Sequence, residues 1–278
     1  MVFKKKIICK KLKINFMQSI IVATDLSLAA NNATLYAIRT AQITKSELIL
    51  FYLFKPVVAE PTSSDIAVIN KEQALIIKER LDEYAAMIYD VYDISIEVVV
   101  RIGDFMNEVD LVAKEYNSSL LIWGMPETSF EDHLMSETLS DNINRLHLPI
   151  LTIPEAATFK GIHNLLFTKN ALHDENEENR LLLNEYAQLF EANIQEHSIC
   201  NTYQLTESNA SIESQQDVSS LNEINAEKII NAIHKEAKQN SADIIIIPNN
   251  EFWYDLLKQT HTRNLVSNSN FPLLCLPN

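Results

Sequence analysis

The chain has 278 residues, enough for one large domain or two ordinary ones, and 47% of them are hydrophobic. No apolar run reaches the roughly 18–20 residues that a membrane-spanning helix needs, so we expect no membrane partner. The net charge is −14, and the residues from Met17 onward carry 17 basic and 37 acidic side chains. That balance argues against nucleic-acid binding by the folded body, because phosphates would be repelled.

The first sixteen residues form a basic leader with six lysines and no acidic residue. They lack the apolar stretch and the small-residue cleavage site of a secretory signal. We expect residues 1–16 to be disordered, with Met17 as an alternative start. Contact of this leader with RNA or an anionic membrane is the less favoured interpretation.

Three cysteines, Cys9, Cys200 and Cys275, lie far apart in the sequence. An odd and sparse set argues against a disulfide framework, and a zinc site would need clustered ligands. We therefore expect a cytoplasmic protein in a reducing compartment, with no metal.

Glycine is unusually rare: the chain holds only Gly103, Gly124 and Gly161, where average usage of about 7% predicts roughly 19. Loops that bind nucleotide phosphates need glycines because backbone N–H groups must approach the phosphate closely. Neither the GxGxxG motif of dinucleotide-binding domains nor the GxxxxGK[ST] motif of P-loops occurs in this sequence. Both of these classes are therefore disfavoured.

Strand and helix patterns alternate along the first half of the chain. Continuous apolar runs predict buried strands at residues 20–23, 48–51, 98–100, 120–123 and 150–153. Apolar residues at helical spacing predict helices with buried faces at residues 30–41, 74–88, 109–116 and 135–146. Strict alternation of this kind is typical of an α/β fold with a doubly wound parallel sheet of five strands.

The pattern then restarts. It predicts strands at residues 165–167, 244–247 and 273–276, and helices at residues 182–190, 229–237 and near 256–257. Both halves end in an apolar strand between two prolines, at residues 149–154 and 272–277. We therefore expect two units, at residues 17–155 and 160–278, that pack as an intramolecular pseudo-dimer with their final strands close together, because an exposed edge strand promotes aggregation.

The second unit is the shorter one. Residues 206–220 are polar and aperiodic, so we expect a mobile loop there in place of a crossover helix, with the third strand short or absent. Three consecutive aromatic residues, Phe252, Trp253 and Tyr254, cannot all face inward on one helix. At least one is expected at a surface or interface, although core packing of two of them is the plainer interpretation.

Several segments resemble the universal stress protein family. They are residues 20–27 (IIVATDLS), Gly103 with Asp104 before the third helix, the strand that ends at Gly124, and the closing strand between prolines. The resemblance covers residues 17–278 as a tandem pair and implies an open parallel sheet with strand order 3-2-1-4-5. It also implies a role in stress survival or regulation, with ATP binding in some members.

ATP-binding members of that family carry Gly-x2-Gly-x9-Gly-Ser/Thr after the fourth strand. The matching positions in the first unit are Gly124, Glu127, Glu137 and Thr138. The matching positions in the second unit are Pro248, Glu251, His261 and Thr262. One of three glycines remains in the first unit and none in the second, and two carboxylates would face the polyphosphate, where like charges repel.

Asp25 ends the first predicted strand, at the crevice where ligands bind in open α/β sheets. The resemblance implies that this acid contacts the nucleoside, which gives a ligand site of Asp25, Gly124 and Thr138. The other interpretation is that Asp25 caps the following helix or bonds turn amides. We match Asp25 with Lys169 in the second unit, and we expect Ser27 to be a helix N-cap rather than a nucleophile.

Two hypotheses from different classes follow. The first is a non-catalytic regulatory or interaction protein of the universal stress type, with no cofactor, little or no ATP binding, and a protein partner. The second is an ATP- or adenosine-ligand-binding protein, with or without slow ATP hydrolysis, that uses the first unit. The low glycine count favours the first hypothesis.

Overall fold

The computed structural model describes residues 17–54, 64–125, 146–170, 177–199, 215–248, 250, 252–253, 256 and 270–277. The predicted leader at residues 1–16 lies outside these ranges. The predicted helix over residues 135–146 also lies outside them, apart from its last residue.

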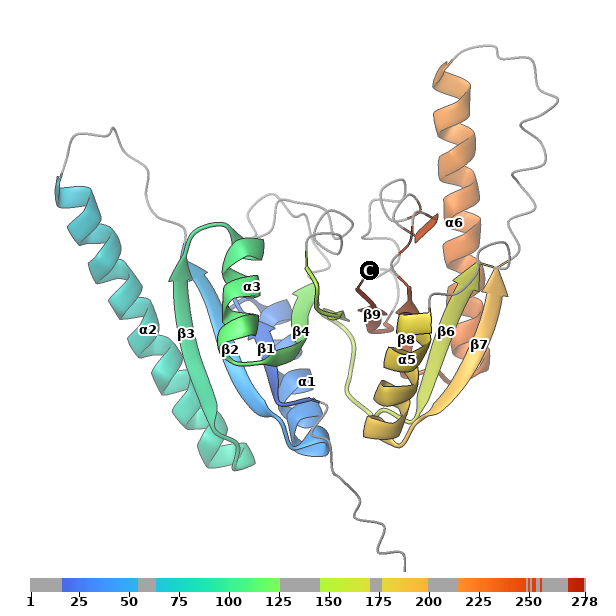
Figure 1. The fold of residues 1–278 in the computed structure, drawn as a ribbon. Helices are drawn as coiled ribbons and strands as arrows, with labels where there is room; N and C mark the ends of the chain where they lie inside the picture. Colours follow the sequence, from blue (N-terminus) through green and yellow to red (C-terminus); the bar gives the residue numbers. More distant parts are fainter. Residues whose placement is uncertain are drawn as a thin grey trace, which may run out of the picture.

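Strands and helices alternate as the sequence predicts (Figure 1). The strands are β1 (Ser19–Ala23), β2 (Glu47–Phe54), β3 (Ile96–Ile102), β4 (Ser118–Met125), β5 (Ile150–Pro154), β6 (Asn164–Asn170), β7 (Asn193–Ile199), β8 (Ile244–Ile247) and β9 (Leu273–Cys275). The helices are α1 (Leu28–Thr44), α2 (Ser64–Tyr92), α3 (Phe105–Glu115), α5 (Glu177–Phe190) and α6 (Gln215–Gln239). All five strands predicted for the first half are confirmed. Among the described residues, no helix is long and apolar enough to cross a membrane.

The nine strands found among the described residues belong to one sheet, in the order β3-β2-β1-β4-β5-β9-β8-β6-β7. The first five have the predicted order 3-2-1-4-5, and the last four run outward from β9 in the matching order without a third-strand equivalent among the described residues. Every neighbouring pair is parallel except β5 and β9, which pair antiparallel at the centre. The sheet is therefore mostly parallel, with a single change of direction where the two halves meet.

Helices cover both faces of this sheet. Side chains of α1, α2 and α5 pack on one face, where Tyr36 and Tyr186 belong to one buried cluster. Side chains of α3 and α6 pack on the other, together with Trp253. Burial on both faces explains why the central strands are continuous apolar runs rather than alternating ones.

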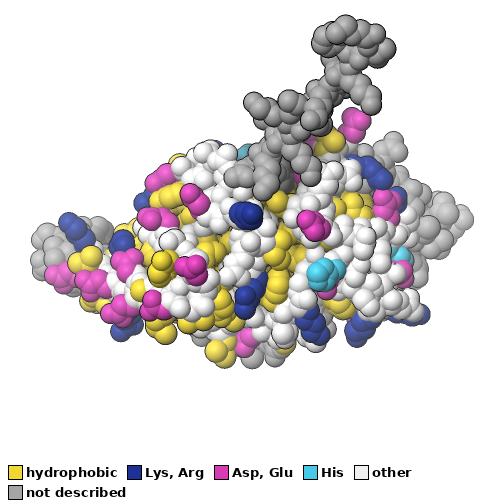
Figure 2. All heavy atoms as spheres, turned by 90° about the horizontal axis from the view of Figure 1, so that it is seen from below, with side chains coloured by type: hydrophobic (Ala, Val, Ile, Leu, Met, Phe, Trp, Pro, Cys, Tyr) yellow, Lys and Arg dark blue, Asp and Glu magenta, His cyan; other side chains and the backbone are white. Residues whose placement is uncertain are grey.

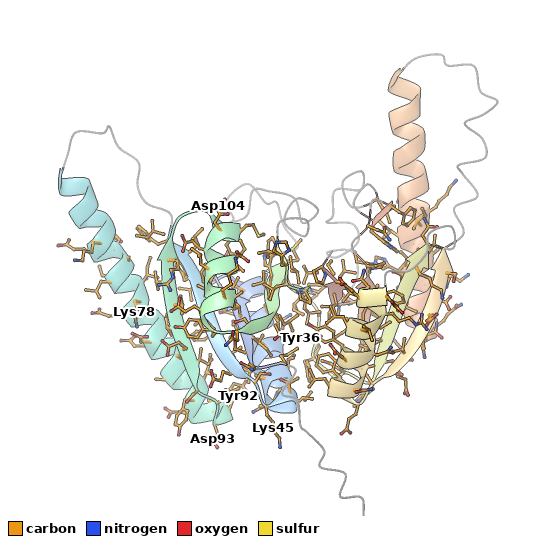
Figure 3. All side chains as sticks on the ribbon, viewed as in Figure 1. Tyr36, Lys45, Lys78, Tyr92, Asp93 and Asp104 are labelled. Atoms are coloured by element: carbon orange, nitrogen blue, oxygen red, sulfur yellow. The ribbon has the colours of Figure 1, made fainter. Side chains whose placement is uncertain are left out.

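Local signals in the sequence set the helix ends. Ser27 caps α1, with its Oγ accepting from the Ala30 amide at 3.2 Å. Asp104 caps α3, with its Oδ1 accepting from the Asn107 amide at 3.1 Å, and it lies at the start of that helix (Figure 3). Lys45 ends α1 in the left-handed conformation, with φ of 59°. The side chains of Ser27 and Asp104 thus accept from backbone amides that have no partner within the helix.

The antiparallel centre relates the two halves residue by residue. One row of laterally paired residues crosses it, in the order Val22, Ile122, Leu151, Leu274, Ile246 and Phe167. The row is symmetric about the Leu151–Leu274 pair. It therefore fixes which positions of the two halves correspond, independently of any sequence alignment.

Two buried tyrosines interact with residues of the other half, one through a hydrogen bond and one through a nearby charge. Tyr186 on α5 donates its hydroxyl to the carbonyl of Ser119 on β4 at 3.2 Å. Tyr36 on α1 has its pKa raised to about 12, first by burial and then by the charge of Asp243 (Figure 3). Ser119 in β4 and Asp243, which directly precedes β8, both lie three residues before the central row. The hydroxyl of Tyr186 therefore links the two halves directly, and Tyr36 is close enough to the second half to sense its charge.

The second half departs from the sequence prediction in two places. The loop predicted over residues 206–220 is wrong for residues 215–220, which form the first turns of α6. Strand β7 was not predicted, because its sequence NIQEHSI is mostly polar, as befits a strand at the edge of the sheet. A strand at the edge of a sheet can be polar, so β7 lacks the continuous apolar run from which the other strands were predicted.

The aromatic run follows the plainer interpretation. Trp253 is only 1% exposed, and Phe252 is half-buried against the same cluster. Their rings meet edge to face with centroids 5.3 Å apart. Tyr254 lies outside the described residues.

Candidate functional site

The turn between β1 and α1 is held by its own side chains. Asp25 Oδ1 accepts from the Ser27 amide at 2.9 Å, and Thr24 Oγ1 accepts from the Leu26 amide at 3.1 Å. Leu26 has a positive φ of 65°, a backbone conformation that residues other than glycine rarely adopt. The two hydrogen bonds hold the backbone in this conformation. Asp25 therefore makes the turn contact that the capping interpretation predicts.

Gly124 lies near the end of β4, beside this turn. A Cβ atom there would be 2.3 Å from the carbonyl oxygen of Ala29 and 2.8 Å from the amide nitrogen of Ala30. Both atoms are backbone, so neither can rotate away. The first turn of α1 can lie this close to β4 only because position 124 has no side chain.

The structure brings two of the three predicted site residues to the same edge of the sheet. Ala23 pairs with Trp123, so Gly124, one residue later, and Asp25, two residues later, lie at the carboxyl ends of neighbouring strands. Tyr52 on β2 also lies there, and its pKa is raised by burial and then by the charge of Asp25. Thr138 lies outside the described residues, as do Glu127 and Glu137.

The second half has a different set of residues at this edge, and the sequence match was wrong by one position. The central row aligns Val22 with Phe167, so the counterpart of Asp25 is Asn170 and not Lys169. Asn170 is 5% exposed. The same row makes Pro248 the counterpart of Gly124 in the second half, as predicted from the motif.

Lys169 instead belongs to a group of three charges on the α5 side of the sheet. Glu196 on β7 accepts from Lys169 at 2.6 Å and from Arg180 of α5 at 2.9 Å. The hydrogen bond from Lys169 is the main cause that lowers the pKa of the Glu196 carboxyl, and Arg180 adds to it. The sequence analysis missed this cluster because it did not predict the strand that carries Glu196.

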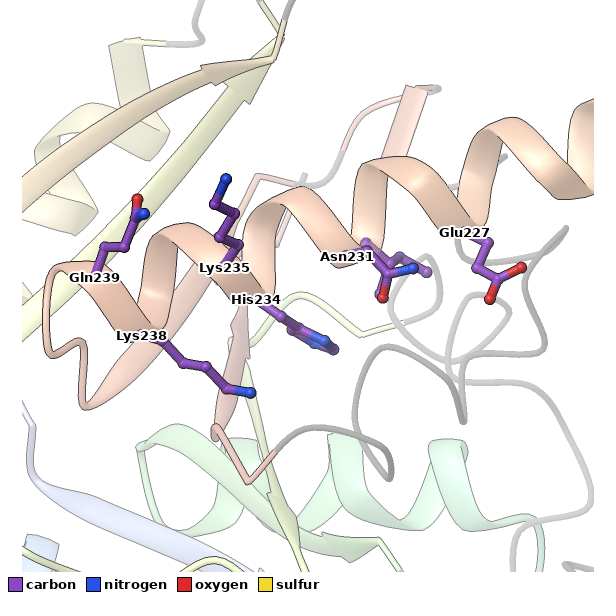
Figure 4. A pocket seen from close by; sticks show the side chains of 7 residues that line it. Glu227, Asn231, His234, Lys235, Lys238 and Gln239 are labelled. Atoms are coloured by element: carbon purple, nitrogen blue, oxygen red, sulfur yellow. The ribbon is translucent and has the colours of Figure 1, made fainter.

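A hollow of about 450 Å³ lies along α6, away from the predicted site. Asn231, His234 and Lys238 extend from one side of the helix toward it (Figure 4). Among the described residues, no group of three histidine, cysteine, aspartate or glutamate side chains is placed to hold a metal ion. The edge formed by Asp25, Tyr52 and Gly124 remains the candidate ligand site.

Comparison with known proteins supports the resemblance. Residues 17–154 match the model of the universal stress protein family. A universal stress protein from Archaeoglobus fulgidus DSM 4304 has a similar fold, with a TM-score of 0.57 and 13% identity over 95% of this chain and 97% of that one. No curated protein sequence matches the chain.

Two further solved structures are more distant. The protein PA1789 from Pseudomonas aeruginosa PAO1, described as functionally unknown, has a TM-score of 0.48 and 15% identity over 95% of this chain and 93% of that one. An Arabidopsis thaliana family protein solved with AMP bound has a TM-score of 0.33 and 16% identity over 49% of this chain and 90% of that one. That likeness is too low to transfer AMP to this chain. Through residues 17–154, the chain belongs to the universal stress protein family.

Proposed function

We propose that this protein is a non-catalytic regulatory member of the universal stress protein family that binds ATP weakly or not at all. The single observation that carries the proposal is the contact at Gly124. Its missing side chain leaves room for the backbone of Ala29 and Ala30, at 2.3 and 2.8 Å from an added Cβ. The one glycine left from the family motif thus has a packing role that needs no phosphate.

The start of α1 supports the same proposal. Helix N-termini bind phosphate through amides that have no acceptor within the helix. Here the amides of Leu26, Ser27 and Ala30 already have side-chain acceptors within the turn. A phosphate that bound these three amides would have to displace those hydrogen bonds.

The lost glycines add an energetic argument. Glu127 and Glu137 bring negative charge to positions where the family has glycine. Thr138 retains a hydroxyl, but one hydrogen bond contributes only about 0.5–1.5 kcal/mol. Millimolar affinity already requires about 4 kcal/mol, so the hydroxyl alone cannot support it.

The second candidate is an ATP- or adenosine-ligand-binding protein that uses Asp25, Gly124 and Thr138, with or without slow hydrolysis. The observation in its favour is that Asp25 and Tyr52 both lie at the carboxyl edge of the sheet, where burial and then the charge of Asp25 raise the tyrosine pKa. A carboxylate and a partly buried ring are suitable groups for contacting a nucleoside.

Isothermal calorimetry with magnesium-ATP separates the two candidates. We expect no saturable heat at micromolar protein, and no nucleotide in native mass spectra of the freshly purified chain. A micromolar dissociation constant that Asp25→Ala abolishes would establish the second candidate. The variant Glu127→Gly with Glu137→Gly should bind ATP more tightly than the unmodified protein if the loop retains the geometry of the family.

We also propose that the protein acts in the cytoplasm as an intramolecular pseudo-dimer with a protein partner. The antiparallel pairing of β5 with β9 and the hydroxyl bond from Tyr186 to Ser119 support the pseudo-dimer. The free and fully buried Cys275, whose pKa burial raises, is compatible with a reducing compartment.

A further inference from the structure

Strand β3 is one end of the nine-stranded sheet. It pairs with β2 over seven residues, and the described part of the chain gives it no partner on its other side. Its sequence contains no proline or lysine, and its centre is the apolar run from Val98 to Val100. Natural sheets usually protect such an edge, because unpaired backbone groups on a long apolar strand recruit further strands.

The sequence of β3 complements itself when reversed. It reads Ile-Glu-Val-Val-Val-Arg-Ile, so an antiparallel copy centred on Val99 sets Glu97 of one chain opposite Arg101 of the other. The same pairing occurs a second time by symmetry. It also sets Ile96 opposite Ile102, which is 49% exposed in the single chain. Directly opposed pairs of opposite charge and of apolar residues both stabilise antiparallel strands.

From this self-complementary edge we infer that two copies of the chain associate through β3, antiparallel, about a twofold axis at Val99. Arg101 also reaches Glu115 of its own chain at 2.6 Å, with the arginine side chain 36% exposed. A guanidinium has five N–H donors, so Arg101 can donate to Glu115 of its own chain and to the opposing Glu97 at the same time.

Helix α2 supplies apolar surface beside this edge. It contacts β3, and from residue 71 onward its exposed large apolar side chains are Leu75, Ile76, Met87, Tyr89 and Val91. In the view from below, apolar side chains lie among charged ones toward the end of the molecule that carries α2 (Figure 2). A twofold axis perpendicular to the sheet places α2 of both copies on one face, where these side chains gain cover.

The centre of the chain already contains a join of the same kind. There β5 and β9 pair antiparallel around Leu151 and Leu274, and α1 contacts α5 on one face. The inferred contact repeats this arrangement with β3 and α2 from two chains.

The opposite edge of the sheet does not share this property. A copy of β7 centred on its middle residue would set Glu196 against Glu196, and the strand also carries Gln195 and His197. Like charges directly opposite each other destabilise a strand pair. The association therefore closes at two chains, because only one of the two edges is self-complementary.

The test uses the full chain, with its mass measured by sedimentation equilibrium over a range of concentrations. We expect the unmodified protein to reach twice 31.7 kDa. Glu97→Arg and Arg101→Glu each set like charges opposite one another twice, so each should raise the dimer dissociation constant about tenfold or more. Combining the two substitutions restores opposite charges and should restore the dimer.

Glu47→Arg is the matched control. It makes the same change in charge at an exposed position of β2, a strand with neighbours on both sides, and should leave the dimer intact. Circular dichroism checks that every variant is folded. If the unmodified chain is monomeric, if it forms open-ended polymers, or if the two charge reversals leave the dimer unchanged, the inference is overturned.

Cross-linking locates the axis independently. Opposed residues of antiparallel strands have Cα atoms about 4.5–5.5 Å apart, which is within the range of a disulfide. Val99→Cys should therefore form a covalent dimer on mild oxidation, whereas the unmodified chain with Cys9, Cys200 and Cys275 should not. A dimer without this cross-link would place the contact elsewhere and refute the inferred axis.

Discussion

Replacing Gly124 by alanine tests the packing role that underlies the proposed function. The added Cβ would lie 2.3 Å from the Ala29 carbonyl oxygen and 2.8 Å from the Ala30 nitrogen, against an ordinary contact of 3.4 Å or more. The start of α1 would have to move by about 1 Å from β4. That helix start is fixed by the Ser27 cap and the Asp25 turn, so the movement breaks hydrogen bonds as well as packing.

The expected cost is about 2–3 kcal/mol, at the upper part of the range for overpacking a core. For a chain of this length it corresponds to a fall in Tm of about 4–12 °C. Urea unfolding followed by circular dichroism measures the free energy, and calorimetry measures Tm. The comparison variant is Gly103→Ala, whose Cβ meets only the movable side chain of Glu108, at 2.8 Å, so that its cost comes from the positive φ of 155° and not from contact with backbone atoms.

The reasoning is refuted by a Gly124→Ala protein as stable as the unmodified one. If that variant also lost measurable ATP binding, Gly124 would serve backbone approach to a phosphate, and the second candidate function would gain. We expect the opposite: a large loss of stability, with ATP binding absent before and after the substitution.

Two further predictions concern stability. Asn32 donates its amide group to the carbonyls of Pro154, Glu155 and Ala157 at 2.8–3.1 Å, so Asn32→Ala should cost about 1–3 kcal/mol in urea unfolding, and an unchanged midpoint would contradict this anchoring role. Glu196→Gln should cost at most about 1 kcal/mol at pH 7, because its partners are partly exposed. Since the folded-state pKa of Glu196 is lowered, this stabilisation is complete above the unfolded pKa of about 4.3 and is lost as pH falls from there through the folded-state pKa; a difference as large at pH 3 as at pH 7 would contradict the ion-pair explanation.

The first half of the fold was predictable because its strands are buried on both faces. A continuous apolar run such as that from Leu48 to Phe51 is typical of a strand buried on both faces. Ser27 and Asp104 indicate helix starts because their side chains can accept hydrogen bonds from the first amides of a helix. The second half was harder where this signal fails. Strand β7 has one exposed edge and a polar sequence, and α6 begins within residues too polar to show helical spacing.

The candidate site was only partly predictable, for a different reason. Position along the chain indicated that Asp25 and Gly124 end neighbouring strands, and the pairing of Ala23 with Trp123 confirms it. The sequence left two roles open for Asp25, and the structure gives it at least the turn contact with Ser27. The reason for Gly124 could not be read from sequence, because it depends on how closely α1 approaches β4.

The mismatch at Lys169 shows what sequence lacks most: lateral register between strands. A shift of one residue moves a side chain to the other face of a sheet. Phe167 packs on the α5 face, so Lys169 lies on that face too, where it pairs with Glu196, which also pairs with Arg180. The position equivalent to Asp25 is the buried and uncharged Asn170. The second half therefore has no carboxylate at the equivalent of Asp25, and Pro248 offers no N–H where the first half has Gly124, so any ligand of the two halves must differ in chemistry.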